Sequence, residues 1–263
     1  MIFISNLTLI KPHLDELRKR GFKPIYLALY GSQNYKLENS QSDVDTKAMV
    51  LPSLRDIVLN QKPVSKTITL ENGEQCDVKD MRLMLENFKK QNVNFLEILF
   101  TEHYFMDEEF KHELTRLRTC REEIAHYNKL SAVKCMKGMA LQKLKAMEHP
   151  YPSVLDKIEK YGYDPKQLHH IARIREFMFR YTRKETFERC LVPRDRDYLM
   201  KIKNAHFTLQ EARIIAQTEM SQINKIKEDF EKHTTGFVDR RVEGLFGDVL
   251  YKIFCKEFKK EII

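Results

Sequence analysis

The sequence contains no apolar run that approaches the roughly 18 residues of a membrane-spanning helix. Its five cysteines are widely spaced and include no C-x-x-C pair of the kind that indicates a zinc or disulfide-exchange site. The opening residues, 1–7, are apolar but have neither the basic region nor the small-residue cleavage site of a secretory signal. We therefore expect reduced thiols, a cytoplasmic location and no membrane partner.

No internal repeat occurs, and no pair of strands carries the interleaved aromatic residues that stack nucleic-acid bases, so a dedicated single-strand-binding sheet is not expected. The composition, 42% apolar and 32% charged, is that of a soluble globular protein with room for one large or two modest domains. Lys and Arg exceed Asp and Glu by 46 to 38. This excess suits a phosphate-rich partner, although many enzymes share it.

Two strands are predicted early in the chain, over 25–30 and 42–50. Because side chains alternate between the faces of a strand, Asp43, Asp45 and Lys47 should project from one face of the second strand. The two carboxylates are then about 7 Å apart along the strand, a spacing suited to one or two divalent cations. The second strand is therefore the candidate metal-binding element.

A Gly-Ser turn, Gly31-Ser32, follows the first strand. Glycine permits close approach of the backbone, and free N–H groups at such a turn can hold phosphate oxygens, with the Ser32 hydroxyl as a further donor. Phosphates beside a cation site suit attack on a nucleotide α-phosphate. One ion then activates the acceptor hydroxyl while another neutralises the leaving pyrophosphate.

A β-hairpin is predicted around Asn72-Gly73, because Asn-Gly between two β-prone runs favours a tight turn. Its second strand carries Asp77, the candidate for a third carboxylate and for help in deprotonating the acceptor. Asp80 competes for this role, but it precedes a helical pattern and fits a helix N-cap better. We therefore assign the third carboxylate to Asp77.

From about Phe110 onward the sequence shows helical periodicity almost throughout, and strand patterns are nearly absent. The fold class expected is α+β, with an α/β catalytic domain over 1–115 and an all-helical domain over 116–263. The helices expected in the second part are 130–147, 165–181, 194–205, 208–230 and 241–258.

The motifs Gly31-Ser32 and Ser42-Asp43-Val44-Asp45, with a later lone Asp on a strand, resemble the DNA polymerase β-type nucleotidyltransferase superfamily. More narrowly, the chain is similar to the predicted nucleotidyltransferases of bacteria and phages, including those of RNA-repair gene clusters. Further matching segments are Asn92 to Phe100 and Lys166-x-x-x-His170-x-x-Arg173. The resemblance covers roughly residues 25 to 230 and leaves the last thirty or so without an interpretation.

This resemblance implies a small mixed sheet with flanking helices, and two Mg²⁺ ions, with Mn²⁺ as an alternative, held by Asp43, Asp45 and Asp77. It also implies a triphosphate on Gly31 and Ser32, and transfer of a nucleoside monophosphate from an NTP to an acceptor hydroxyl with release of pyrophosphate. The net charge favours an RNA or tRNA 3′ end as the acceptor. A protein hydroxyl or a small molecule remains open.

Two residues of the first half have alternative interpretations. Lys47 could contact a phosphate, or it could be a lysine that keeps an edge strand soluble. Glu97 lies in an apolar run, where we favour a helix-surface position with its carboxyl reaching solvent. The alternative for Glu97 is a buried partner that orients a cation or the helical domain.

In the helical half, Lys166, His170 and Arg173 fall at i, i+4 and i+7 and therefore share one helix face. A cationic stripe of this kind suits nucleotide phosphates or an RNA backbone, while the alternative is a solvated polar stripe. A second function class also stays open. The fold could serve as a nucleotide- or RNA-binding module with weak catalysis in a phage-defence or toxin–antitoxin system.

Overall fold

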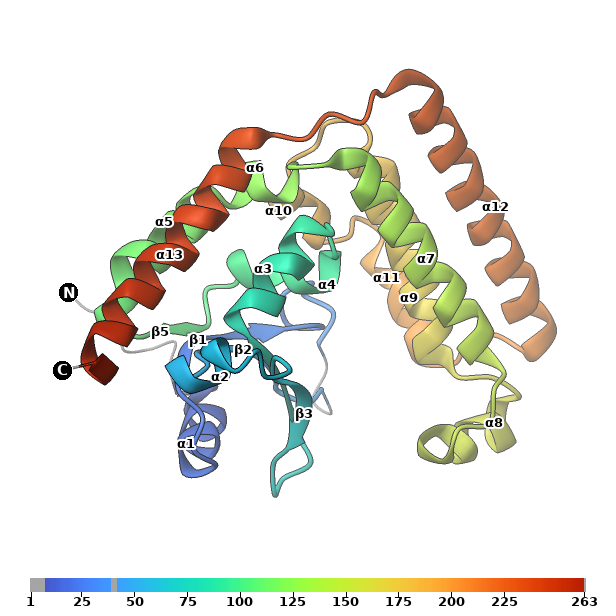
Figure 1. Ribbon diagram of the computed structural model, residues 1–263. Helices are drawn as coiled ribbons and strands as arrows, with labels where there is room; N and C mark the ends of the chain where they lie inside the picture. Colours follow the sequence, from blue (N-terminus) through green and yellow to red (C-terminus); the bar gives the residue numbers. More distant parts are fainter. Residues whose placement is uncertain (1–7, 39–41, 263) are drawn as a thin grey trace. The chain divides into compact units, whose positions relative to one another are not determined.

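The computed structural model describes residues 8–38 and 42–262, so the opening segment 1–7 lies outside the described residues. Within these ranges the chain is an α+β fold in which a five-stranded mixed sheet is accompanied by many helices (Figure 1). The strands are β1 (Pro24–Tyr30), β2 (Asp45–Val50), β3 (Ser65–Thr69), β4 (Gln75–Asp80) and β5 (Tyr104–Met106). Their order in the sheet is β3-β4-β2-β1-β5. Strands β2 and β4 run parallel and the other neighbours antiparallel, which confirms the predicted mixed sheet.

Helices make up most of the rest of the described chain. The α-helices are α1 (Lys11–Lys19), α2 (Leu54–Val58), α3 (Met81–Lys89), α4 (Val93–Leu96), α5 (Lys111–Thr119), α6 (Arg121–Ala125), α7 (Lys129–Met147), α8 (Leu155–Tyr161), α9 (Pro165–Tyr181), α10 (Phe187–Leu191), α11 (Arg196–Lys203), α12 (Leu209–His233) and α13 (Arg240–Ile262). Short 3₁₀ turns are η2 (Glu97–Leu99), η3 (Glu108–Phe110) and η4 (Pro152–Val154). Within residues 107–262 all the regular elements are helices, in agreement with the helical periodicity predicted from about Phe110 onward.

The predicted hairpin forms between β3 and β4. Gly73 has a φ of +88°, a left-handed conformation that glycine adopts without strain, and its N–H donates to the carbonyl of Leu70. Strand β4 then pairs with β2, so Lys47 is paired on both sides, with Ala28 of β1 and Asp77 of β4. The edge-strand interpretation of Lys47 is therefore wrong, because β2 is an interior strand of the sheet.

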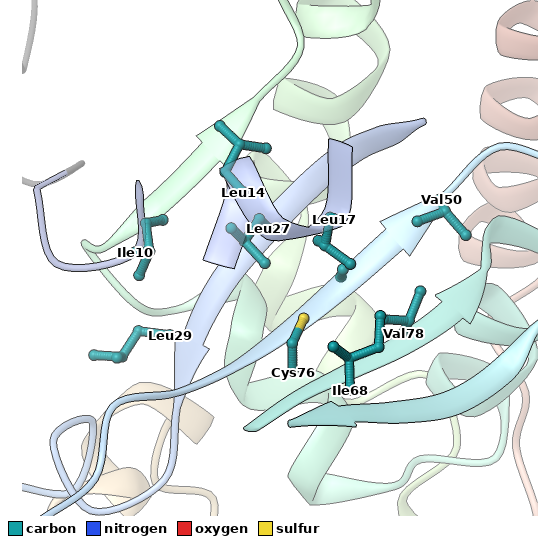
Figure 2. Close-up of a cluster of buried hydrophobic side chains, with 10 residues drawn as sticks. Ile10, Leu14, Leu17, Leu27, Leu29, Val50, Ile68, Cys76 and Val78 are labelled. Atoms are coloured by element: carbon teal, nitrogen blue, oxygen red, sulfur yellow. The ribbon is translucent and has the colours of Figure 1, made fainter. Parts of the chain in front are cut away.

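One face of the sheet carries the hydrophobic core of this part of the chain, and α1 lies over it (Figure 2). Alternate residues of each strand supply its side chains, as the period of two requires. The cluster consists of Ile10, Leu14, Leu17, Leu27, Leu29, Ala48, Val50, Ile68, Cys76 and Val78. Each fully buried leucine contributes on the order of 1.5–3 kcal/mol. The opposite face is left for the polar residues of β2 and β4.

Helix α3 follows β4 directly and begins at the predicted cap. The Asp80 carboxylate accepts a hydrogen bond from the Arg82 N–H at 2.8 Å and forms an ion pair with the Arg82 guanidinium at 2.6 Å. Asp80 is 1% exposed, and these contacts occupy both of its oxygens. The N-cap role predicted for Asp80 is confirmed.

The described residues divide into two compact units. Unit 1 comprises the described residues of Met1–Asn128 and Val238–Ile263, and unit 2 is Lys129–Phe237. The last helix, α13, thus belongs to the unit that contains the sheet, although the chain reaches it only after unit 2. This division concerns packing, and the assignment of a catalytic domain to 1–115 and a helical domain to 116–263 stays a prediction.

Helix α13 packs on α3 and α5 through a regular apolar seam. Its buried side chains recur at intervals of three or four residues, the period of one helix face: Val242, Phe246, Val249 and Ile253. Phe246 contacts the rings of Phe88 and Tyr127, with centroids at 6.3 and 6.1 Å. Ion pairs flank the seam, including Lys256 to Glu113 at 2.8 Å. The final segment, which the sequence left without an interpretation, is therefore part of the core of unit 1.

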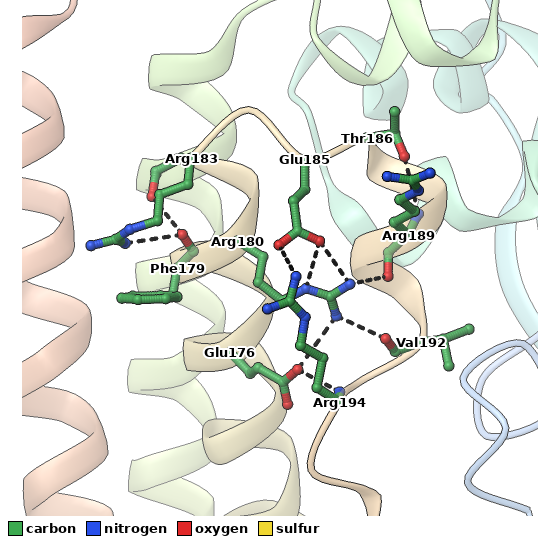
Figure 3. A network of polar contacts seen from close by, with 10 residues as sticks. Glu176, Phe179, Arg180, Arg183, Glu185, Thr186, Arg189, Val192 and Arg194 are labelled. Carbon is green, nitrogen blue, oxygen red and sulfur yellow. Dashed lines mark hydrogen bonds and ion pairs between the residues drawn. The ribbon is translucent and has the colours of Figure 1, made fainter.

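In unit 2, α9 is the central helix and packs against α7, α11 and α12. Its last turn carries Arg180, which is 6% exposed. The Arg180 guanidinium donates to the carboxylates of Glu185 at 3.0 Å and Glu176 at 3.4 Å, and to the carbonyls of Val192 at 2.8 Å and Arg189 at 2.6 Å (Figure 3). This network ties α9 to α10 and to the segment after it. No helix among residues 8–38 and 42–262 is long and apolar enough to cross a membrane.

Candidate functional site

The predicted carboxylates of β2 lie where β1 ends and where β2 and β4 begin. Asp45 is the first residue of β2, faces Tyr30 in the pairing register, and its Oδ1 accepts a hydrogen bond from the Gln75 N–H at 3.1 Å. Asp43 precedes it by two residues, is exposed and lies outside β2, so the predicted alternation of Asp43 with Asp45 and Lys47 along one strand is wrong for Asp43. Because β1 ends at Tyr30, the Gly31-Ser32 turn begins at the same end of the sheet. Asp45 and the start of the Gly31-Ser32 turn therefore lie at the same end of the paired strands β1 and β2.

Asp77 lies next to Lys47 across the parallel pair of strands. The Lys47 ammonium is 3.6 Å from Asp77 Oδ2, and the Lys79 ammonium is 2.8 Å from Asp77 Oδ1. Asp77 and Lys79 alternate with the core residues Cys76 and Val78, which places the polar pair on the face opposite the hydrophobic cluster. Both oxygens of Asp77 thus face a positive charge.

The Lys47 ammonium is enclosed by aromatic rings rather than by water. It is 4% exposed and lies 3.5 Å from the ring centroid of Tyr30 and 4.7 Å from that of Phe95. Burial lowers the pKa of Lys47, while Asp77 and Glu97 act in the opposite direction. Burial likewise raises the pKa of Tyr30, with Asp45, Glu97 and Asp77 adding to the effect. Lys47 is therefore the centre of a buried charged cluster.

Glu97 is fully buried, and the helix-surface interpretation of this residue is wrong. Helix α4 ends at Leu96, and the 3₁₀ turn η2 rotates the next side chains inward, so the helical period no longer applies. Glu97 Oε2 accepts hydrogen bonds from the Gly31 N–H at 3.1 Å and from Asn34 Nδ2 at 3.4 Å. While this contact holds, the Gly31 N–H is engaged by a carboxyl group and not by a phosphate.

A metal centre built from three protein carboxylates is not preformed: within residues 8–38 and 42–262, no three His, Cys, Asp or Glu side chains are grouped to hold an ion. Asp43 and Asp45 are hard oxygen donors two residues apart, which is the chemistry that Mg²⁺ takes. Asp77 instead has two ammonium partners. The donor set thus fits a cation on Asp43 and Asp45, and the assignment of Asp77 as a ligand stays a prediction.

The three predicted phosphate contacts of the helical half lie on α9 in unit 2, whereas the acids of β2 and β4 lie in unit 1. Lys166 is exposed in the first turn of α9, His170 is half-buried, and Arg173 is 4% exposed. Burial, and after it the charge of Arg173, holds the pKa of His170 well below its ordinary value. The three side chains are therefore not equally solvated, although they share a helix face.

Sequence reasoning assigned no role to several residues of this cluster. Lys47 and Asp77 are surrounded by Tyr30, Phe95 and Lys79. The sequence offers a signal for Tyr30 and Lys79, because alternation along a strand directs their side chains to the same face of the sheet as Lys47 and Asp77. A cavity of 390 Å³ also exists, but it opens at the far end of β2 and β4, where Val50 and Asp80 line it. The cavity is therefore not lined by Asp45 or Asp77.

The neighbour of His170, His169, gives a prediction for acid stability. His169 is 5% exposed, and its Nε2 has no hydrogen-bond partner among residues 8–38 and 42–262. Burial, assisted by the positive charge of Arg173, lowers the pKa of His169 to about 3. An unfolded chain binds this proton near pH 6.5 and the folded chain does not, so stability falls as pH decreases from about 6.5 toward 3.

Because only the unfolded chain binds a proton at His169, we expect the free energy of unfolding to fall by about 2–3 kcal/mol between pH 6 and pH 4. The slope approaches about 1.4 kcal/mol per pH unit. Urea denaturation at each pH should show a shallower acid loss in His169→Asn than in the wild type. His206→Asn, which alters an exposed histidine, is the control and should leave the slope unchanged. Equal slopes in all three proteins would show that His169 protonates in the folded chain.

No protein-family model and no curated protein matches this chain. Among solved structures, it is similar to a nucleotidyltransferase-like protein from Exiguobacterium sibiricum 255-15. The likeness covers 94% of this chain and 79% of that chain, with 11% sequence identity and a TM-score of 0.33. It is a distant likeness.

Proposed function

We propose that this chain is a nucleotidyltransferase that moves a nucleoside monophosphate from an NTP to an acceptor hydroxyl and releases pyrophosphate. The observation that supports the proposal most directly is the pairing of Asp45, two residues after Asp43, with Tyr30, which the Gly31-Ser32 turn follows directly. A cation site beside a turn with hydrogen-bond donors suits the phosphates of a nucleotide. The preferred acceptor is an RNA or tRNA 3′ end, in keeping with the net charge of +8.

Each residue has a proposed role in this reaction. Asp43 and Asp45 would hold divalent ions, two Mg²⁺ with Mn²⁺ as the alternative, and Asp77 is the proposed third ligand and helper in deprotonating the acceptor. Bound Mg²⁺ supplies Lewis-acid stabilisation of the transferring phosphate. The Ser32 hydroxyl donates to a phosphate oxygen, and the Lys47 ammonium adds positive charge beneath it.

The α9 residues Lys166, His170 and Arg173 are proposed as further contacts to phosphate, either of the nucleotide or of an RNA backbone. Arg173 and Lys166 carry the positive charge for this role. His170 would act as a neutral hydrogen-bonding group, because its pKa is held well below its ordinary value by burial. Their part in the reaction is separable from that of the acids and can be tested by nucleotide affinity alone.

One observation favours a second candidate function. Both oxygens of Asp77 face ammonium groups, so its charge is already balanced. A chain in which the third carboxylate is neutralised in this way could bind nucleotide or RNA with weak catalysis, as a module of a phage-defence or toxin–antitoxin system. The same experiment separates the two candidates.

The test is incubation of the protein with labelled NTPs, Mg²⁺ and either total RNA or candidate acceptor proteins. We expect the wild type to transfer label and Asp43→Asn/Asp45→Asn to lose transfer to background. Asp15→Asn, an exposed acid on α1, is the matched control and should transfer normally. Transfer that survives in the double variant would refute the assigned site, and RNA binding without transfer in the wild type would favour the binding module.

A further inference from the structure

The Gly31-Ser32 turn is hydrogen-bonded to the carboxyl group of Glu97, which is distant in the sequence. Glu97 has no exposed surface, and its Oε2 accepts from the Gly31 N–H at 3.1 Å and from Asn34 Nδ2 at 3.4 Å. Asn34 Nδ2 also donates to the Leu29 carbonyl at 3.1 Å. The carboxyl group therefore contacts both sides of the turn, the glycine and the polar residue three positions later.

The segment that contains Glu97 is hydrogen-bonded to β1. The Tyr26 hydroxyl donates to the Ile98 carbonyl at 2.8 Å, and the Leu29 N–H donates to the His103 carbonyl at 3.0 Å. Tyr26 is 2% exposed, so the first of these contacts is shielded from water. The residue that follows Glu97 is thus hydrogen-bonded to β1, and the Glu97 side chain reaches the glycine that follows the end of that strand.

The contact also determines which group of the turn is available to a ligand. Gly31 has a φ of +91°, and its N–H is directed at Glu97. Ser32 is half-buried, and its carbonyl accepts from the Tyr35 and Leu37 N–H groups, which closes the turn on its other side. The Ser32 hydroxyl is left as the side-chain donor of the Gly-Ser pair.

We propose that Glu97 is a positioning residue that fixes the Gly31-Ser32 turn in the conformation that presents Ser32 to a nucleotide phosphate. The inference rests on the proposed nucleotidyl transfer and adds a residue that does not touch the substrate. Burial of an acid with hydrogen bonds from two donors stabilises one turn conformation, because either donor would be left unsatisfied in another. The turn is therefore preorganised for the phosphate.

Two conservative variants separate the hydrogen bond from the charge. Glu97→Gln keeps an acceptor oxygen at the same distance from Gly31 but is neutral, whereas Glu97→Asp keeps the charge and withdraws the oxygen by about one methylene. If the residue acts by holding the turn, the first variant should behave like the wild type and the second should not. If Glu97 instead acts through the attraction of its negative charge for the Lys47 ammonium, Glu97→Asp should behave like the wild type and Glu97→Gln should not.

The first measurement is calorimetric binding of a non-hydrolysable NTP with Mg²⁺. We expect Glu97→Asp to bind roughly tenfold more weakly, and Glu97→Gln to remain within about threefold of the wild type. Glu113 is the matched control, since it is 3% exposed and pairs with Lys256 in the same unit away from the turn. Glu113→Gln and Glu113→Asp should leave the dissociation constant within about twofold.

The second measurement is hydrogen exchange of the Gly31 amide by NMR, which needs no nucleotide. We expect exchange to accelerate at least about tenfold in Glu97→Asp and to stay near the wild-type rate in Glu97→Gln. Slow Gly31 exchange in Glu97→Asp, or equal nucleotide affinity in both variants, would overturn the proposal while leaving the transferase function intact. A wild type that binds no NTP would instead refute the proposed function, and exchange would still decide whether Glu97 holds the turn.

Discussion

Replacement of Phe246 by alanine is expected to lower the unfolding free energy of the unit that contains the sheet by about 3–5 kcal/mol. Phe246 is 1% exposed and lies against the rings of Phe88 and Tyr127. Its removal leaves a cavity between α13 and α3 that the neighbouring helices fill only in part, because they are held elsewhere along the seam. The measurement is urea denaturation followed by far-ultraviolet circular dichroism.

Tyr251→Ala is the matched control for this prediction. Tyr251 is an aromatic residue of the same helix but is 69% exposed, so its loss should change the unfolding free energy by no more than about 0.5 kcal/mol. Both variants shorten an aromatic side chain to alanine and have the same effect on helix propensity. Equal destabilisation by the two would contradict the assignment of α13 to the core.

Replacement of Arg180 by methionine is expected to destabilise unit 2 by about 3–5 kcal/mol. Methionine keeps the length of the side chain but removes the donors that Glu185, Glu176 and two carbonyl groups now share. Glu176 is 9% exposed and retains only the Arg194 N–H at 2.6 Å among the contacts shown in Figure 3. A glutamate that stays buried without its guanidinium partner destabilises the folded state. The loss of unfolding free energy is therefore larger than for breaking a surface ion pair.

Arg183→Met serves as the control, because Arg183 lies three residues away at the same helix end. Its guanidinium is exposed and stacks over Phe179 at 3.5 Å from the ring centroid, a contact worth no more than about 1 kcal/mol. Urea denaturation of both variants gives the comparison. A loss below about 1 kcal/mol for Arg180→Met would show that the carboxylates find other partners.

Much of the sheet could be predicted from local pattern. Asn72-Gly73 specifies its own turn through the left-handed conformation of the glycine, and Asp80 specifies a helix start through a contact only two residues away. The alternation along β2 placed Lys47 and Ala48 on opposite faces, and the structure confirms it. Such features depend on neighbouring residues, whose chemistry is visible in the sequence.

Features that depend on distant partners could not be predicted in this way. The sequence allows an edge-strand position for Lys47 because nothing near it reveals that β4 pairs beside it, and this pairing helps to bury the ammonium. Glu97 was placed at a helix surface because its partner, the Gly31 N–H, lies 66 residues earlier. The apolar face of α13 was equally visible, but the sequence does not state which surface it covers.

The division of the chain has a consequence for its synthesis. Unit 1 is completed by Val238–Ile263, which leaves the ribosome after all of Lys129–Phe237. At roughly 5–20 residues per second, translation of the intervening unit takes on the order of 5–20 s. During that interval the nascent sheet and its first helices exist without α13, and Phe88 has no Phe246 to cover it. A helix made after unit 2 therefore completes the packing of a unit whose sheet is made before it.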